Sequence, residues 1–296
     1  MQQSNGNSAT QNERYRRLIE QIDNLPALPA IVSKLIQVVN SPDTSAEDAA
    51  RLIQKDPALT TKMLRLANSA FYGIPRSISS VSSAVVILGF NTIRSLVLSA
   101  SVMKMFSSSN RPAIDKDRFW KHSIVCAMAA KTITRQNINI RMMDPESAFC
   151  AGILHDIGKL IFSEFAREDY SEVYNFARSS GISLYEAEKR TLGITHSEIG
   201  RILADKWALP LDLEYALVFH HDPMQADSLV DLVTTVHLAD ILTHQAGVGL
   251  WDNEPIVPEW DQARSVLRIG DDEYEHIMAS LNDTINKSDE FIQIIQ

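Results

Sequence analysis

The chain has 296 residues, of which 45% are hydrophobic and 22% charged, and its formal net charge at pH 7 is −9. This composition is typical of a soluble globular protein with enough chain for one large domain or two ordinary ones. Because the net charge is negative, nothing attracts the chain generally to phosphate backbones, and we expect no nucleic-acid binding without a local basic patch.

The N-terminal residues are polar, and we predict that residues 1–11 are disordered. The opening MQQSNGNSATQN has neither the basic start nor the apolar core of a signal peptide. Helical apolar spacing begins in RRLIEQIDNL, at Leu18, Ile19 and Ile22, and continues in IVSKLIQVV at 31–39. The basic run ERYRR at 13–17 is interpreted as the solvated face of this first helix.

Helix starts are well marked along the chain. Ser45 and Thr195 are each followed three residues later by an acidic side chain, as in a capping box. Asp56-Pro57 and Asp144-Pro145 place proline at the favoured first helical position. In SSAVVILGFNT, Gly89 is interpreted as a break between two helices, and no hairpin signal appears elsewhere. We therefore predict an all-α chain.

A boundary between two helical subdomains is predicted near SSSNRPAIDK, residues 107–116. All eight histidines lie beyond it, which separates a packing module from a module that carries a site. The predicted organisation is a disordered start, an N-terminal helical subdomain, a site-bearing helical subdomain and a C-terminal extension, at 1–11, 12–110, 111–249 and 250–296. We expect the extension to be a packed helix pair after a loop, WDNEPIVPEW.

The stretch FCAGILHDIGKLIF, residues 149–162, is apolar enough for a buried helix. It nevertheless places His155 beside Asp156, with Lys159 one helical turn after the histidine. Burying charge without a partner is unfavourable, so this pair indicates a site. The two cysteines, Cys126 and Cys150, lie in similar apolar patterns and are expected to be reduced core residues rather than a disulfide.

The candidate site combines five imidazoles and two carboxylates from several predicted helices: His122, His155, Asp156, His196, His220, His221 and Asp240. All-α proteins build mixed nitrogen and oxygen metal sites in this way. The set exceeds what one ion needs and suits two ions ~3.5–4 Å apart, bridged by Asp156, an arrangement that activates water against phosphorus. Such ligands suit Fe, Mn, Zn or Ni, and Lys159 is a candidate for steadying a phosphate oxygen.

Each of these residues also has a simpler interpretation. A single histidine is more often hydrogen-bonded in the core, the pair His220-His221 suits the end of a helix, and Lys159 can extend to solvent. His237 and His244 share a helix with Asp240 and are given no role. They serve as internal controls, and we expect that replacing His244 by alanine has little effect on metal content.

At these residues the sequence resembles the HD superfamily of metal-dependent phosphohydrolases, and more closely its HDOD family, the HD-related output domains of bacterial signalling proteins. The resemblance covers most of residues 25–245 and is carried by LPALPAIVSKLIQVVNSPDTS, IQKDPALTTKMLRLANSAFYG, ISSVSSAVVILGFNTIRSLVL, FCAGILHDIGKL, THSEIGRILADKWALP and FHHDP. It implies an HD-like helical bundle preceded by an N-terminal helical subdomain. The ligand pattern of the related HD-GYP phosphodiesterases then places one metal on His122, His155, Asp156 and Asp240, and a second on His196, His220, His221 and the shared Asp156.

Two departures bear on activity. MQADSLVDL follows HHDP without a Gly-Tyr-Pro motif, so the element that recognises cyclic di-GMP in HD-GYP proteins is missing. Arg118 stands where some HD-GYP proteins have a glutamate for a third metal, so we do not expect three metals. HDOD domains are generally regarded as non-catalytic output or scaffold modules.

Three functions remain as hypotheses. The preferred one is a cytoplasmic, bacterial signalling scaffold without a membrane segment, which retains two metals and binds a partner protein through its N-terminal half. The second is a metal-dependent phosphohydrolase acting on a nucleotide or cyclic nucleotide, favoured by the complete ligand set. The third is a di-iron oxygenase, a chemistry known on related HD scaffolds.

Overall fold

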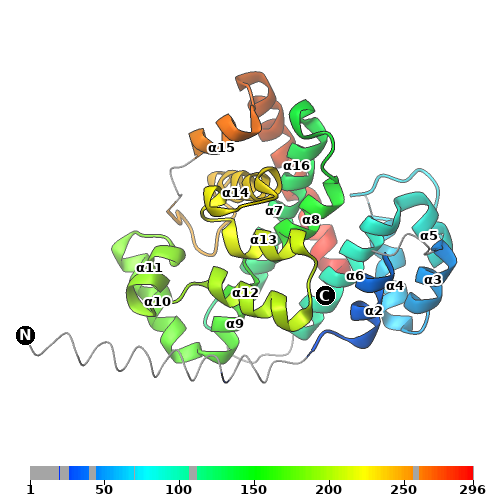
Figure 1. Ribbon diagram of the computed structural model, residues 1–296, viewed down its shortest axis with the longest axis horizontal. Helices are drawn as coiled ribbons and strands as arrows, with labels where there is room; N and C mark the ends of the chain where they lie inside the picture. The colour runs from blue at the N-terminus through cyan, green and yellow to red at the C-terminus, as the bar shows by residue number, and fades with distance from the viewer. Residues whose placement is uncertain are drawn as a thin grey trace, which may run out of the picture.

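The computed structural model describes residues 20, 27–39, 45–69, 71–106, 112–255 and 260–295. Within these ranges every regular element is a helix, which confirms the all-α prediction (Figure 1). The predicted disordered residues 1–11, the basic run at 13–17 and the apolar stripe of the first expected helix lie outside the described ranges. So do residues 107–111, in which part of the predicted subdomain boundary falls, and the division into subdomains stays a prediction.

The N-terminal helices that the structure describes lie to one side of the molecule (Figure 1). They are α2 (Ala30–Val39), α3 (Ala46–Ile53), α4 (Pro57–Ala67), α5 (Val81–Leu88) and α6 (Phe90–Met105). Ser45 closes a capping box at α3, and Asp56 caps α4 ahead of its first-turn proline, as predicted. We call α2 to α6 the N-terminal block.

Gly89 separates α5 from α6 with a φ of 84°, a conformation that favours glycine. The two helices meet at 119°. By length and composition this bent pair resembles a broken membrane span, whereas no single described helix is long and apolar enough to cross a bilayer. The break lets α6 run alone into the interior, where most of its residues are buried.

The remaining helices form a larger bundle around α7, Lys116–Gln136 (Figure 1). Short 3-10 helices lie at Ile138–Ile140 and Pro223–Gln225, and the α-helices are α8 (Pro145–Leu154), α9 (Ile157–Phe165), α10 (Arg167–Ser180), α11 (Leu184–Thr191), α12 (His196–Trp207), α13 (Leu211–Phe219), α14 (Val230–Gln245), α15 (Trp260–Leu267) and α16 (Asp271–Ile295). The capping sequences at Asp144 and Thr195 open α8 and α12 as predicted. In the C-terminal helix pair, α15 packs on α14, whereas α16 packs along α7 and reaches α4.

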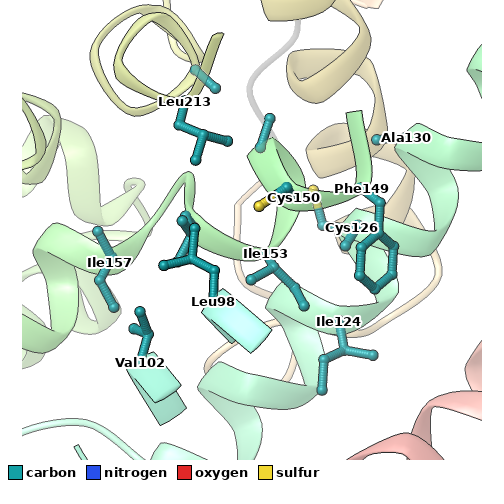
Figure 2. Packing of buried hydrophobic residues seen from close by; sticks show 14 of the residues in the cluster. Leu98, Val102, Ile124, Cys126, Ala130, Phe149, Cys150, Ile153, Ile157 and Leu213 are labelled. Atoms are coloured by element: carbon teal, nitrogen blue, oxygen red, sulfur yellow. The ribbon is translucent and has the colours of Figure 1, made fainter. Parts of the chain in front are cut away.

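The core continues from the N-terminal block into the larger bundle. Figure 2 shows side chains of α6, α7, α8, α9 and α13 meeting in one apolar layer, with Leu98, Ile124 and Ile153 among them. Cys126 and Cys150 both lie in this layer as free, buried cysteines, as predicted, and burial raises the pKa of the Cys150 thiol to about 12. Because α7 and α8 share the core with α6, the site that they carry is fixed relative to the N-terminal block.

The approach of α8 to α7 depends on Gly152. A Cβ atom at this position would lie 2.7 Å from the Cα atom of Ala127, which is backbone and cannot move aside. The backbone carbonyl of Gly152 also accepts a hydrogen bond from the ring of His155, so Gly152 helps to orient a candidate site residue.

We predict that Gly152→Ala destabilises the fold by about 1–3 kcal/mol, because an added methyl group overpacks the contact between α8 and α7. Urea unfolding measures the change. The matched control is Gly270→Ala, since nothing lies within 4 Å of a Cβ atom there. Equal stability of the two variants would contradict the close contact described above.

Candidate metal centre

The stretch at 149–162 is two helices rather than the single helix expected from its apolar composition. α8 ends at Leu154 and α9 begins at Ile157, and His155 and Asp156 form the turn between them. A Cβ atom on Gly158 would collide with the backbone carbonyl oxygen of His196, so glycine lets α9 lie against the start of α12. The turn therefore places His155 and Asp156 close to the other candidate side chains.

The structure brings all seven predicted metal ligands together in two groups. They come from the middle of α7, the α8–α9 turn, the first residue of α12, the end of α13 and the interior of α14. The potential ligand atoms within each group lie within 4.8 Å of one another, and the groups are His122, His155 and Asp240, and Asp156, His196, His220 and His221. Six of the seven residues are buried, and His221 is half-buried.

Asp156 lies between the two groups and faces both. Its Oδ2 atom is 3.4 Å from His155 Nε2 and 3.7 Å from His122 Nε2. Its Oδ1 atom is 3.2 Å from His196 Nε2 and 3.5 Å from His220 Nε2. A carboxylate in this position can give one oxygen to each of two ions, as a bridging ligand does.

Hydrogen bonds at Nδ1 orient four of the five imidazoles. His122, His155 and His220 bond the backbone carbonyls of Val248, Gly152 and Ala216 at 2.8, 2.7 and 2.9 Å. His196 Nδ1 lies 2.7 Å from a carboxylate oxygen of Glu188. When Nδ1 carries the donated proton, Nε2 offers its lone pair to the centre, which is the usual arrangement of a metal-bound histidine.

Several atoms that face the centre are buried without a hydrogen-bond partner. They are His122 Nε2, His155 Nε2, Asp156 Oδ1 and Asp240 Oδ1. His122 Nε2 comes within 3.0 Å of Asp240 Oδ1, but the two atoms do not have hydrogen-bond geometry. Leaving such groups unpaired is unfavourable. The donor set of imidazole nitrogen and carboxylate oxygen therefore fits divalent metal ions, and it does not distinguish Fe, Mn, Zn and Ni.

Buried charges shift the pKa values of these groups. Burial opposes ionisation of Asp156, yet His155 and Lys159 hold the pKa of its carboxyl well below the ordinary value. Burial likewise opposes protonation of His155 and His196, but the neighbouring carboxylates of Asp156 and Glu188 raise both pKa values. At His220, burial dominates and lowers the pKa to about 4.

Lys159 is directed at the centre rather than at solvent. Its Nζ atom lies 2.6 Å from Asp156 Oδ2, and its side chain is 6% exposed. Burial disfavours the charged ammonium, but the Asp156 carboxylate raises its pKa above the ordinary value. The ammonium group of Lys159 thus balances the charge of the Asp156 carboxylate. The Lys159 side chain also lines a small cavity beside the centre.

Glu188 is a site residue that the sequence analysis missed. Its carboxylate accepts hydrogen bonds from the backbone nitrogen of His196 at 2.7 Å and from the hydroxyl of Tyr170 at 2.7 Å, in addition to its contact with the His196 ring. The side chain is completely buried. Within EAEKRT, residues 186–191, only helical periodicity distinguishes Glu188 from the other polar residues. Glu188 lies four residues after Leu184, on the same buried face of α11.

The two histidines that were given no role also touch the centre. His237 Nδ1 lies 2.6 Å from the backbone carbonyl oxygen of His220, so it supports the His220-His221 pair. His244 Nε2 lies 3.3 Å from Asp240 Oδ1. Both residues therefore contact predicted ligands, and the small effect expected for His244→Ala stays an untested prediction.

The cavity beside the centre is small. Its volume is about 20 Å³, and its lining includes Lys159, Tyr185, His221, Asp240 and Glu254. One water molecule needs ~10–15 Å³ of such volume, whereas drug-sized ligands occupy ~300–1,000 Å³. Tyr185 covers His221 with its ring, the two centroids lying 4.1 Å apart. In this conformation the cavity has room for water but not for a nucleotide.

Comparison with known proteins shows what the chain is similar to. The HDOD domain model matches residues 25–223. A solved structure of an HDOD domain protein with unknown function from Geobacter sulfurreducens has a TM-score of 0.80 and 26% identity, covering 97% of this chain and 99% of that one. A structure from Shewanella amazonensis SB2B, called a "putative phosphohydrolase", has a TM-score of 0.75 and 25% identity, covering 95% and 98%.

One curated relative, an uncharacterized protein from Treponema pallidum (strain Nichols), is 24% identical over 225 residues. The match includes 76% of this chain but only 43% of the relative. The chain thus aligns with less than half of the length of that protein.

We predict that Glu188→Ala lowers metal affinity about 10- to 100-fold, because it removes the group that orients His196. Titration of the metal-free protein with Mn²⁺ measures the loss. Glu186→Ala on the same helix is the control, since Glu186 is partly exposed and pairs with Arg190. Wild-type affinity in the Glu188 variant would contradict this role.

Metal affinity should rise with pH across the neutral range. His155 and His196 have pKa values above the ordinary 6.5, so they hold protons that a metal must displace, and raising the pH through those values removes the competition. The limiting slope is about tenfold per pH unit for each proton released. Mn²⁺ titrations from about pH 6 to about pH 9 measure the slope. An affinity that is independent of pH would contradict the protonation states described here.

Proposed function

The chain belongs to the HDOD family, and we propose that it is a signalling output domain, or scaffold, built around a binuclear metal centre. Asp156 carries the proposal, because each of its two oxygens faces a different group of histidines. In a scaffold the metals join α7, the α8–α9 turn, α12, α13 and α14, and their binding energy adds to the stability of the fold. Metal at ~100 times its Kd stabilises a protein by about 2.7 kcal/mol for each site.

The closed surroundings of the centre favour a scaffold over an enzyme. A cavity of about 20 Å³ offers no room for a nucleotide. Lys159, the candidate group for steadying a phosphate oxygen, already contacts Asp156. The absence of Gly-Tyr-Pro after FHHDP points in the same direction, because that motif recognises the substrate in the related phosphodiesterases.

The N-terminal block is the proposed partner-binding half of this cytoplasmic protein. Val86 and Ile87 on α5 are 74% and 52% exposed, whereas Val81, Ala84 and Val85 on the same helix are buried. α6 packs on α8, the helix that ends at His155. A partner held by the N-terminal block is thus connected to the metal centre by a continuous core.

A second candidate function is metal-dependent hydrolysis of a phosphoester in a nucleotide or cyclic nucleotide. The complete ligand set favours it, as does the name of the related structure from Shewanella amazonensis. Two bound metals would supply Lewis acidity to polarise water and a phosphate oxygen. Access for such a substrate would require residues that line the cavity, such as Tyr185 and Glu254, to move.

We expect about two metal ions per chain in the purified protein and almost none in Asp156→Ala, because that change removes the ligand shared by both positions. Elemental analysis measures both values. Asp205→Ala, an exposed carboxylate on α12, is the control and should keep its metal. A folded wild-type protein that neither contains nor takes up metal would contradict the proposed centre.

The scaffold proposal also predicts no turnover of bis(4-nitrophenyl) phosphate or of cyclic dinucleotides by the metal-loaded protein, because its cavity excludes them. Release of nitrophenol, or of linear nucleotide on chromatography, is the measurement. Turnover that is present in the wild type and absent in Asp156→Ala would establish the second candidate function instead.

A further inference from the structure

The segment that follows α14, residues 247–255, turns back over the metal centre, and we call it the clasp. It begins at Gly247, whose φ of 78° turns the chain. The backbone carbonyl of Val248 is the oxygen that lies 2.8 Å from His122 Nδ1. The clasp therefore orients one proposed metal ligand directly.

His244, at the end of α14, joins the clasp to a second ligand. Its Nε2 atom lies 3.3 Å from Asp240 Oδ1, and its Nδ1 atom lies 3.7 Å from Glu254 Oε2. Its ring packs against the ring of His122, with centroids 4.6 Å apart. The imidazole thus stands between two carboxylates, one a proposed ligand and the other a residue of the clasp.

Glu254 is held in place by the backbone of the clasp. Its side chain is 4% exposed, and its Oε2 atom accepts a hydrogen bond from the Leu250 backbone nitrogen at 2.7 Å. A Cβ atom on Gly249 would lie 2.7 Å from Glu254 Oε2 and 3.1 Å from His244 Nδ1. Glycine at this position therefore gives the carboxylate room to approach the imidazole.

The outer side of the clasp is fastened by groups from α7 and α10. Both terminal nitrogens of Arg118 lie 3.0 Å from Asp252 Oδ1. Tyr174 donates a hydrogen bond from its hydroxyl to the Leu250 carbonyl at 3.3 Å, and its ring packs edge-on against Trp251. Arg118 is the residue that stands in place of a third-metal glutamate, and here it binds the clasp.

Within the described part of the chain, the hydrogen bond and the ion pair that link the clasp to proposed ligands fall on one of the two ligand groups, and Glu254 also lines the small cavity together with His221 and Lys159. The clasp reaches His122 through Val248, and Asp240 through His244. In the other group, His196 is oriented by Glu188 and His220 by the backbone of α13. The two metal positions thus have separate supports.

We propose that His244 and Glu254 are a positioning pair through which the clasp sets the occupancy of the metal position at His122, His155 and Asp240, while the other position is independent of it. The inference rests on the proposed metal centre. Its physical basis is that a residue hydrogen-bonded to a metal ligand orients that ligand. Removing such a residue typically lowers metal affinity about 10- to 100-fold. The clasp gives the centre two unequal positions, one of which responds to a surface segment.

The test is equilibrium dialysis of metal-free protein against Mn²⁺ alone. The wild type should bind two ions, whereas His244→Ala and Glu254→Ala should bind one with unchanged affinity and the second about 10- to 100-fold more weakly. His244→Gln, which keeps a donor towards Asp240, should restore part of the loss. His276→Ala is the matched control, because His276 is an exposed histidine on α16 and should change neither affinity.

Arg118→Ala provides a milder variant, because it removes only the exposed ion pair between Arg118 and Asp252 of the clasp. It should weaken the same single ion by about two- to fivefold, as expected for a surface ion pair. Circular dichroism checks that each variant is folded.

Two wild-type affinities in both His244→Ala and Glu254→Ala would overturn the inference and leave the metal centre intact. Equal weakening of both ions in folded variants would also overturn it, since the clasp would then not be selective. A wild type that binds no Mn²⁺, and contains no metal when purified, would instead remove the proposed centre itself.

Discussion

The structure is organised around the burial of one carboxylate. Asp156 is almost completely withdrawn from water, and a charge in that position must be compensated by its neighbours. Lys159 supplies a cation at 2.6 Å, and imidazoles from three helices and from the adjacent turn surround the two oxygens. The glycines on either side of the turn allow α8 and α9 to approach α7 and α12 closely enough for this to happen.

The imidazoles are directed inward mainly by the backbone. Carbonyl groups of α8, α13 and the clasp bond His155, His220 and His122. His196 is held instead by a side chain, that of Glu188. These supports come from elements packed in the core or tied to it, so they hold the proposed ligand atoms in a fixed arrangement, which is how a preorganised site gains affinity.

A preorganised centre with a cavity of about 20 Å³ is well suited to holding ions and poorly suited to admitting a nucleotide. The scaffold and hydrolase proposals therefore use the same candidate ligands. They differ in whether a substrate can reach the centre. Tyr185 and Glu254 are among the residues that line this cavity. The clasp, which carries Glu254, follows shortly after α14, so the segment that we propose to support one metal position also lines the cavity.

Periodicity, capping and residue type are local properties, so the helical class, the capped helix starts, the family and the seven candidate ligands could all be predicted from the residues in chain order. The sequence did not reveal the break at His155-Asp156, since fourteen mostly apolar residues also satisfy a continuous helix. Nor did it reveal Glu188, His244 or the clasp, whose roles depend on which atoms lie nearby. Only tertiary packing decided those contacts, because they join residues that are separated along the chain or hidden in an ordinary helical pattern.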